Sequence, residues 1–436
     1  MFSIGNDAVT ANITYKLFFL RAQSLNSYIS HGNYMLERGL ESFFEDFLHK
    51  ESLFTDRNAL LSSYTPETVN YRDNEIKRIA NILAPALKQE KPSNLFVYGN
   101  TGTGKTLVVR YVTGNIASVA DKKNIPLKHI YVNCKLKRVA DTEYRLVAQL
   151  AQFFGKSIPP TGLPTDEIYN IFYKAVENHK CVVIIILDEI DQLIKRAGDG
   201  VLYNLVRINE ELKESRIAVI GVSNDITFIE NVDARVKSSL SEEDVFFAPY
   251  NAVELQSILR DRAAKAFRAN VVGEGVIEKC AAYVARENGD ARKAIELLRV
   301  AGEIAERSKD KKISTPHIDD AEEKMEKDKI FSVIKTQPKQ FQAVLFSIFS
   351  LRNKSTAVYG GEIYDLYKEL CFRIGLRPLT QRRVSSIIGE FELMGMISTR
   401  TISKGRYGRT REINTSIATS TVPLAKKILE EELGLR

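Results

Sequence analysis

The chain has 436 residues, of which 44% are hydrophobic and 27% are charged, and its formal net charge at pH 7 is +7. This length allows two or three folded domains, and the composition is that of a soluble globular protein. No apolar run reaches the roughly 20 residues of a membrane span, and the N-terminus has no secretion-signal pattern, so we expect a cytoplasmic protein with no membrane partner.

The positive charge is concentrated in the last quarter of the chain. Residues 331–436 contain 17 Lys and Arg against 9 Asp and Glu, a net charge of +8, whereas the preceding residues contain 45 against 46. A basic segment beside a neutral one indicates a polyanionic partner for that segment alone. A basic surface that is merely solvated is the alternative.

Short apolar runs alternate with helical stretches from residue 72 to residue 250. The first helix is predicted at 72–90. The run at 182–187 is apolar without interruption, as in a parallel strand that is covered on both faces. The alternation predicts an α/β domain with a parallel sheet. Strand-like runs begin at Asn94, His129, Cys181, Ile217 and Asp244.

The strand signals end near Asn251, and the apolar spacing of the next segments predicts a small all-helical domain. Gly289 lies where one helix should stop, and Asp290 lies where the next should be capped. Residues 309–329 are strongly charged and predict a solvated helix with a linker.

The last segment combines helices with a hairpin. Two β-like runs, at 396–403 and 409–416, follow three predicted helices and flank a glycine-containing turn. Three helices followed by a β-hairpin is the order of a winged-helix domain. The predicted helices are 338–352, 360–375, 379–396 and, after the hairpin, 423–434.

The string "GNTGTGKT" matches the phosphate-loop pattern G-x-x-x-x-G-K-[ST] and lies between a strand and a helix, as that motif requires. Its backbone N–H groups and the helix N-terminus favour phosphate. Lys105 should contact the β- and γ-phosphates, and the Thr106 hydroxyl should bind Mg²⁺. The motif therefore predicts an ATP/ADP site. Its residues are Gly99, Asn100, Thr101, Gly102, Thr103, Gly104, Lys105 and Thr106.

Two carboxylates end the apolar strand in "IIILDEID". Asp188 can hold Mg²⁺ through water, and Glu189 can polarise an attacking water. In the alternative interpretation Asp188, Glu189 and Asp191 are capping acids of the next helix. Asn224, at the tip of another β run, is either a phosphate or water contact or a turn residue.

These features together resemble the AAA+ ATPase class. The resemblance implies a five-stranded parallel sheet of order 5-1-4-3-2 with helices on both faces, a small helical lid domain, and ATP bound between them. Segment 64–79 would help form the adenine pocket. The matched positions are Lys105 and Thr106 for Walker A, Asp188 and Glu189 for Walker B, Asn224 for sensor one and Arg292 for sensor two.

Longer strings make the resemblance more specific. The chain is similar to archaeal replication initiators of the origin-recognition and helicase-loader family from about Leu36 to its end. The domains would be an extension at 1–35, the AAA+ ATPase domain at 36–249, the lid at 250–330 and a winged-helix DNA-binding domain at 331–436. The strings are "YRDNEI", "YGNTGTGKT", "YVNCK", "TEYRLVAQLA", "ILDEID", "VLYNLVRINEEL", "VIGVSND", "ARVKSSL" and "GDARKAIELLR".

The resemblance implies an ATP-dependent, nucleoid-associated initiator that binds double-stranded origin DNA and helps load a replicative helicase of the minichromosome-maintenance type. Paralogous initiators would bind the same DNA. One residue departs from the AAA+ pattern, because Ser239 of "ARVKSSL" occupies the place of the usual arginine finger. We therefore expect a slow ATPase that serves as a switch. The alternatives are a DNA-binding regulator without loading activity, and a signalling or transposition-type ATPase whose winged helix contacts protein.

The predicted helix 379–396 carries arginines in its first turn, where the helix dipole disfavours positive charge. The N-terminus of a recognition helix meets bases and phosphates, so DNA binding would explain this placement. Arginines on a solvated face are the alternative. Thr380 is the expected N-cap. The outward candidates are Gln381, Arg382, Arg383 and Ser385, and the expected core set is Val384, Ile387, Ile388, Phe391, Leu393, Met394 and Met396.

The turn "RTISKGRYGRT" would be the tip of the wing. Gly405 and Gly408 permit a tight turn, and the basic side chains can follow phosphates or a narrow groove. An aromatic side chain that only shields the hairpin is the alternative for Tyr407. The candidate DNA contacts are Lys404, Arg406, Tyr407, Arg409 and Arg411. The family resemblance adds a second contact around 135–165, with Lys135, Lys137, Arg138 and the turn at 159–162 as candidates.

Overall fold

A computed structural model of the chain describes residues 51–62, 64–66, 69–135, 142–159, 162–240, 242–352, 358–403, 409–418 and 421–435. Residues from Asp56 onward form one compact unit. The predicted extension at 1–35 lies outside the described residues. Among the described helices, none is long and apolar enough to cross a membrane.

The first domain is built on a parallel five-stranded sheet. The strand order is β2-β3-β4-β1-β5, which confirms the predicted order 5-1-4-3-2. In this order the two strands that precede the phosphate loop and the acid pair, β1 and β3, lie on either side of β4. The strands are β1 Leu95–Gly99, β2 Leu127–Asn133, β3 Val182–Asp188, β4 Arg216–Ser223 and β5 Glu243–Phe247.

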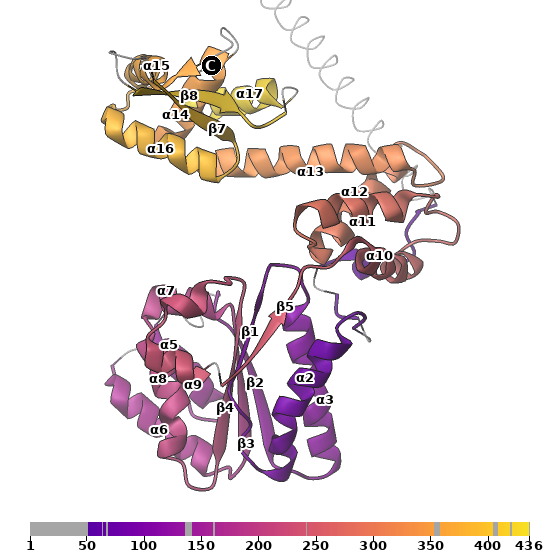
Figure 1. Cartoon of the computed structure of the whole chain (residues 1–436), viewed down its shortest axis with the longest axis vertical. Coiled ribbons are helices and arrows are strands. Elements are labelled where there is room, and N and C mark those ends of the chain that lie inside the picture. Colours follow the sequence, from indigo (N-terminus) through magenta and orange to yellow (C-terminus); the bar gives the residue numbers. More distant parts are fainter. Residues whose placement is uncertain are drawn as a thin grey trace, which may run out of the picture. The chain divides into compact units, whose positions relative to one another are not determined.

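Helices cover both faces of this sheet (Figure 1). The side chains of β3 alternate between two cores because successive residues of a strand point to opposite faces. Val183, Ile185 and Leu187 pack with the α5–α9 layer, whereas Ile184 and Ile186 pack with α2 and α3. The helices are α2 Asp73–Leu83, α3 Lys105–Lys122, α5 Glu143–Gln152, α6 Thr165–Glu177, α7 Ile190–Ala197, α8 Gly200–Arg207 and α9 Ala234–Leu240, with short 3-10 turns at Arg57–Leu60, Ala84–Lys88, Ile208–Glu210 and Phe228–Asn231.

The next segment is helical, as predicted. Helix α11 ends before Gly289, which adopts a φ of 60°, and the Asp290 side chain accepts the N–H groups of Arg292 and Lys293 to cap α12. Both boundary predictions are confirmed. The helices are α10 Ala252–Ala266, α11 Val276–Glu287, α12 Ala291–Arg307 and α13 Thr315–Thr336.

Helix α13 is shared between two cores. Ile318 and Ala321, in its first half, are buried, and α13 packs on α11 and α12. Ile334, in its last turn, belongs to the core of the C-terminal domain. The charged stretch at 309–329 therefore does contain the predicted helix, and that helix continues past the end of the stretch to Thr336. The expected domain limits remain a prediction.

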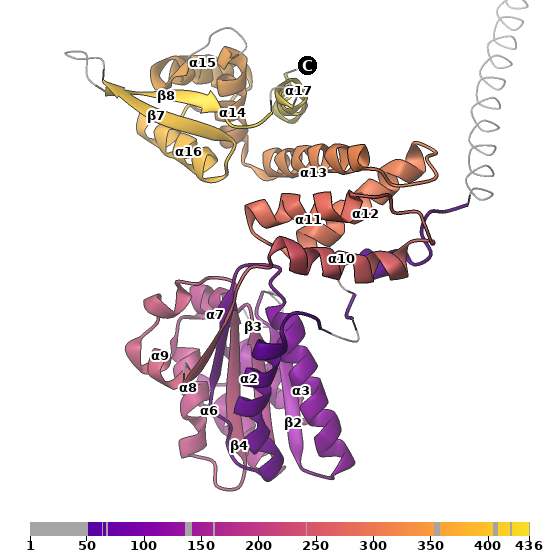
Figure 2. The same ribbon diagram turned by 45° about the vertical axis from the view of Figure 1, so that its right-hand side comes forward.

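The C-terminal domain has the winged-helix order (Figure 2). An antiparallel sheet of order β6-β8-β7 packs on helices α14 to α16, and the β7–β8 hairpin contacts the helix region through β7 and α16. The elements are α14 Lys339–Arg352, β6 Val358–Tyr359, α15 Gly360–Arg373, α16 Gln381–Leu393, β7 Ile397–Ser403, β8 Arg409–Thr415 and α17 Val422–Leu433.

One part of the predicted core of α16 is wrong. Leu393 is 90% exposed and Met394 is 41% exposed. The buried residues Val384, Ile387, Ile388 and Phe391 follow the i, i+3, i+4 spacing of one helix face. Leu393 lies two positions after Phe391 and so falls on the opposite face.

Candidate nucleotide site and nucleic-acid interface

The loop between β1 and α3 has the backbone expected of a phosphate loop. Gly102 and Gly104 adopt φ angles of 69° and 92°, a left-handed conformation that favours glycine. Helix α3 begins at Lys105, so its unpaired N–H groups lie directly after the loop. The loop therefore offers a helix N-terminus and turned backbone for an anion.

Lys105 lies inside this loop with only 4% of its surface exposed. Its Nζ donates to the carbonyl oxygens of Gly99, at 2.9 Å, and Asn100, at 2.6 Å. The pKa of Lys105 is lowered to about 8, chiefly by burial; the Asp188 carboxylate opposes this shift, and the charge of Arg292 contributes to it. The ammonium is thus held where burial disfavours its charge, and a nearby anion would stabilise it.

Asp188 and Thr106 lie together at the carboxyl end of β3. The Thr106 hydroxyl donates to Asp188 Oδ2 at 3.0 Å and lies 3.2 Å from Oδ1. The Tyr131 hydroxyl donates to Oδ2 at 2.6 Å. A carboxylate and a hydroxyl are hard oxygen ligands of the kind that Mg²⁺ takes together with substrate phosphates. These side chains therefore fit the predicted magnesium role.

Glu189 has a strained backbone, and its carboxylate does not cap a helix. It adopts a left-handed φ of 54° at the N-cap of α7 and makes no side-chain capping hydrogen bond. For Glu189 the capping alternative is therefore not supported. The carboxylate instead lies 3.6 Å from the Lys135 ammonium. Non-glycine residues in this conformation cluster at functional sites.

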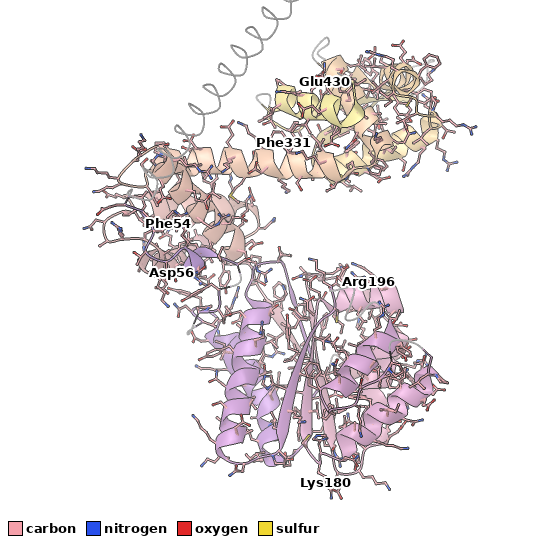
Figure 3. All side chains as sticks on the ribbon, turned by 180° about the vertical axis from the view of Figure 1, so that it is seen from behind. Phe54, Asp56, Lys180, Arg196, Phe331 and Glu430 are labelled. Carbon is pink, nitrogen blue, oxygen red and sulfur yellow. The ribbon has the colours of Figure 1, made fainter. Side chains whose placement is uncertain are left out.

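A single cavity of about 750 Å³ brings most of the predicted nucleotide residues together. Its wall contains Gly102, Gly104, Lys105, Thr106, Asp188, Glu189, Asn224 and Arg292. The remaining residues of the predicted loop support it without lining the cavity. Thr103, for example, is buried and donates its hydroxyl to the Asn100 carbonyl at 2.9 Å. These supporting residues are Gly99, Asn100, Thr101 and Thr103. The cavity lies at the α7 end of the sheet, where Figure 3 labels Arg196, and away from Lys180 at the other end.

A second part of the cavity is lined by both polar and apolar residues from segment 61–70, α10 and α12. Tyr64, Val69, Ile258 and Ile295 line it, which matches the segment expected near the base. The Arg262 guanidinium stacks on the Tyr64 ring at 4.4 Å. This region combines an aromatic ring with aliphatic side chains, a surface suited to a planar base.

Two residues that the sequence reading did not single out hold the site together. Arg72 is 4% exposed and donates from Nε to the Thr103 carbonyl at 3.1 Å and from a terminal N–H to the Ala248 carbonyl at 2.5 Å. Its guanidinium stacks on Tyr250 at 4.0 Å. Tyr131 lines the cavity and contacts Asp188. Arg72 lies in the string "YRDNEI" and Tyr131 in "YVNCK", but no feature of the neighbouring sequence indicates which residues they contact.

The predicted recognition helix exposes its first turn. Gln381, Arg382, Arg383 and Ser385 are all exposed on α16. Thr380 caps the helix by accepting the N–H of Arg383 at 3.4 Å, as predicted. Arg383 also donates to Glu390 at 3.1 Å, so an intramolecular carboxylate competes for this side chain.

The wing itself is only partly described. Arg411 on β8 is exposed, whereas Lys404, Arg406 and Tyr407 lie outside the described residues, as does the side chain of Arg409. In the predicted second DNA contact, Lys135 is exposed and Pro159 accepts the Tyr144 hydroxyl at 2.7 Å. Lys137 and Arg138 lie outside the described residues, and so does the side chain of Ser239.

Family models match three segments of the chain: an AAA domain over residues 88–227, a Cdc6 AAA+ ATPase-type lid domain over 256–323, and a CDC6 C-terminal winged helix domain over 332–424.

The chain is also similar to named proteins. An ORC1-type DNA replication protein of Pyrococcus furiosus is 47% identical over 383 residues, which cover 87% of this chain and 90% of that protein. ORC1-type DNA replication protein 1 of Methanosarcina mazei is 45% identical over 402 residues, covering 92% and 95%. The solved structure of Aeropyrum pernix ORC1 in complex with DNA matches with a TM-score of 0.75 and 41% identity, covering 88% of this chain and 98% of that one.

Proposed function

Because this chain belongs to the family of ORC1-type DNA replication proteins, the ORC1/Cdc6 type of replication initiator with AAA and winged-helix domains, we propose a specific role for it. In this proposal ATP binding switches its grip on double-stranded origin DNA. The bound protein bends that DNA and helps load a replicative helicase of the minichromosome-maintenance type. Slow ATP hydrolysis then resets the switch.

The observation that carries the ATP part is the cavity in which Lys105, Thr106, Asp188 and Glu189 converge. Bound Mg²⁺ would supply charge neutralisation on the phosphate oxygens. Thr106 and Asp188 would hold the ion, and Lys105 and the loop backbone would bind the β- and γ-phosphates. Glu189 would orient and polarise the attacking water.

Two further side chains complete the proposed chemistry. Asn224 and Arg292 line the same cavity although they are far apart in the sequence. Asn224 follows β4, and Arg292 lies on α12. Asn224 is suited to hydrogen-bond the γ-phosphate or the water, and the Arg292 guanidinium to neutralise phosphate charge. Since Arg292 belongs to the first turn of α12, contact with phosphate would also bias the position of that helix.

The proposal of slow hydrolysis rests on the residues around the usual arginine-finger position. Ser239 stands there and has no positive charge. The nearby Arg235 is paired with Asp233 at 3.1 Å. An arginine finger accelerates phosphoryl transfer by roughly 10³–10⁵, so its absence favours a switch over a motor.

The DNA part is supported by charge and exposure. The net charge of +8 is confined to residues 331–436, and Arg382 and Arg383 are exposed in the first turn of α16. Aeropyrum pernix ORC1, which is 41% identical to this chain, has been solved in complex with DNA. The proposed contacts are Gln381, Arg382, Arg383, Ser385, Lys404, Arg406, Tyr407, Arg409 and Arg411.

A titration of a fluorescent origin-type duplex at several salt concentrations tests the DNA role. Each lost phosphate contact lowers the slope of log K against log salt by about 0.9. We expect Arg382→Ala to weaken binding and to reduce this slope or relax the sequence preference. The control Lys180→Ala, at the far end of the ATPase sheet (Figure 3), should match the parent. Equal affinity and slope in all three proteins would contradict the assignment of α16.

A further inference from the structure

The structure points to a role for Tyr131 in the metal end of the cavity. We propose that Tyr131 is a positioning residue for Mg²⁺-dependent nucleotide binding: its hydroxyl holds the Asp188 carboxylate in the orientation in which Asp188 and Thr106 share a divalent cation. This inference rests on the proposed function, because it concerns the same ATP site.

The sheet register places Tyr131 beside the acid pair. On β2 and β3, Tyr131 is opposite Ile186, and Asn133 is opposite Asp188. Residues two apart on a strand share a face, so Tyr131 and Asp188 form a diagonal pair that a long aromatic side chain can span. The Tyr131 hydroxyl reaches Asp188 Oδ2 at 2.6 Å. The contact thus joins the β2 strand to the end of β3.

The Asp188 carboxylate is fixed at both oxygens. Oδ2 accepts the Tyr131 hydroxyl, and Oδ1 accepts the backbone N–H of Glu189 at 3.0 Å. The Thr106 hydroxyl lies within 3.2 Å of both oxygens. Of these three donors, Tyr131 and the Glu189 N–H come from the sheet and its end. Thr106 comes from the phosphate loop, which must also receive the nucleotide.

This division of partners has a chemical consequence. A threonine hydroxyl that ligates a cation does so through an oxygen lone pair and can still donate its O–H to the carboxylate, but its position is then set by the ion and the phosphate loop. Of the three donors, Tyr131 and the Glu189 N–H orient the Asp188 carboxylate independently of the ion and the nucleotide. Hydrogen-bonded partners behind a metal-binding carboxylate commonly change metal affinity by 10–100-fold when they are removed. Tyr131 is the side-chain partner of that kind.

The ring of Tyr131 is held independently of its hydroxyl. The Arg110 guanidinium stacks on it at 4.7 Å, and both side chains line the cavity. A phenylalanine would keep this stacking and lose only the hydrogen bonds of the hydroxyl, to Asp188 and with the Asn133 side chain. Removal of the hydroxyl is therefore a selective perturbation.

The same sheet offers a matched control. Tyr98 on β1 donates its hydroxyl to Asp244 of β5 at 3.2 Å, but neither residue lines the nucleotide cavity. Tyr98→Phe thus removes the same group from a tyrosine–aspartate pair in the same domain. Any general effect of such a change on the sheet should appear in both variants.

The experiment measures the affinity of the full-length chain for a fluorescent ADP or ATP analogue, first in EDTA and then across a Mg²⁺ titration. In EDTA we expect the parent, Tyr98→Phe and Tyr131→Phe to bind equally. The Mg²⁺ midpoint should rise by roughly 10–100-fold in Tyr131→Phe alone. Binding of Mn²⁺ in place of Mg²⁺, followed by electron paramagnetic resonance, gives a readout that does not depend on turnover.

Three results would overturn the inference. A Mg²⁺ midpoint of Tyr131→Phe equal to the parent's would show that the hydroxyl has no role at the metal. A lower melting temperature with an unchanged midpoint would show a structural role only. Loss of nucleotide binding in EDTA would show that the Tyr131 hydroxyl is needed for the fold of the whole site. A parent that binds no nucleotide, or binds it without Mg²⁺ dependence, would contradict the proposed function itself.

Discussion

The unusual environment of Lys105 predicts that the affinity for ATP depends on pH. Burial lowers the pKa of this lysine to about 8, whereas phosphate binding requires the charged ammonium. Bringing phosphate oxygens beside Nζ stabilises the protonated form. Above about pH 8, binding must therefore take up a proton, and affinity should fall as pH rises.

The size of the effect follows from the shift. The ordinary pKa of the group is 10.5, and its value here is about 8. Each pH unit above the lowered pKa weakens binding about tenfold, or about 1.4 kcal/mol, until the pKa of the complex is reached. We therefore expect a loss of about 30-fold at about pH 9.5. A complex that fully restores the ordinary pKa sets a limit of about 300-fold.

Titration of a fluorescent ATP analogue from about pH 7 to about pH 9.5 measures this dependence. Calorimetry in two buffers with different ionisation enthalpies counts the proton directly. The charged groups whose fields act on Lys105 are Asp188, Arg292, Asp290 and Arg72. Lys105→Arg, if it binds ATP, should show no such dependence. An affinity that is constant across the range would refute the reasoning.

Three other predictions concern the catalytic carboxylate of Glu189, the phosphate loop and the wing. Glu189→Gln should bind ATP but hydrolyse it far more slowly, because an amide is a poor base; single-turnover hydrolysis at the parent's rate would contradict the assignment. Gly102→Ala should lower nucleotide affinity and cost about 1 kcal/mol or more of stability. The reason is that φ at this position is 69° and that a Cβ would lie 1.6 Å from Asp290 Oδ1. A variant whose calorimetric melting temperature and nucleotide affinity equal the parent's would contradict this prediction. Replacing Arg406 and Arg409 together by Ala should weaken DNA binding without changing nucleotide affinity. The slope of log K against log salt should become shallower by up to about 2. Unchanged DNA affinity in an anisotropy titration would show that the wing is not part of the interface.

The features that could be predicted from the sequence are those determined by residues that are close together in the chain. The uninterrupted apolar run of β3 indicated a buried parallel strand, and the structure buries every residue of it. Gly289 and Asp290 marked a helix boundary because their conformational and capping preferences are local. The phosphate loop is likewise a contiguous string, so its place before α3 could be read directly.

The contacts that the sequence could not predict join distant segments. Arg72 contacts the carbonyls of Thr103 and Ala248 and stacks on Tyr250. An arginine normally reads as a surface residue, and only the fold brings these partners around it. The Tyr131–Asp188 hydrogen bond depends in the same way on the register of β2 and β3.

The wrong assignment of Leu393 has a simpler cause. It was placed in the core because it is apolar and close to the buried residues of α16. The 3.6-residue period that puts Ile387, Ile388 and Phe391 inside puts Leu393 outside. Position on the helix face, rather than residue type, decides burial at the end of a short helix.

The central claim is that ATP state controls how this protein grips specific double-stranded DNA. Footprinting of the purified full-length chain on the intergenic DNA of its own genome, with and without ATP, tests it most directly. The account predicts protection of discrete intergenic sites and a change in the extent of protection or in the DNA distortion when ATP is present. Absence of discrete protected sites, or a footprint that is the same with and without ATP, would contradict it.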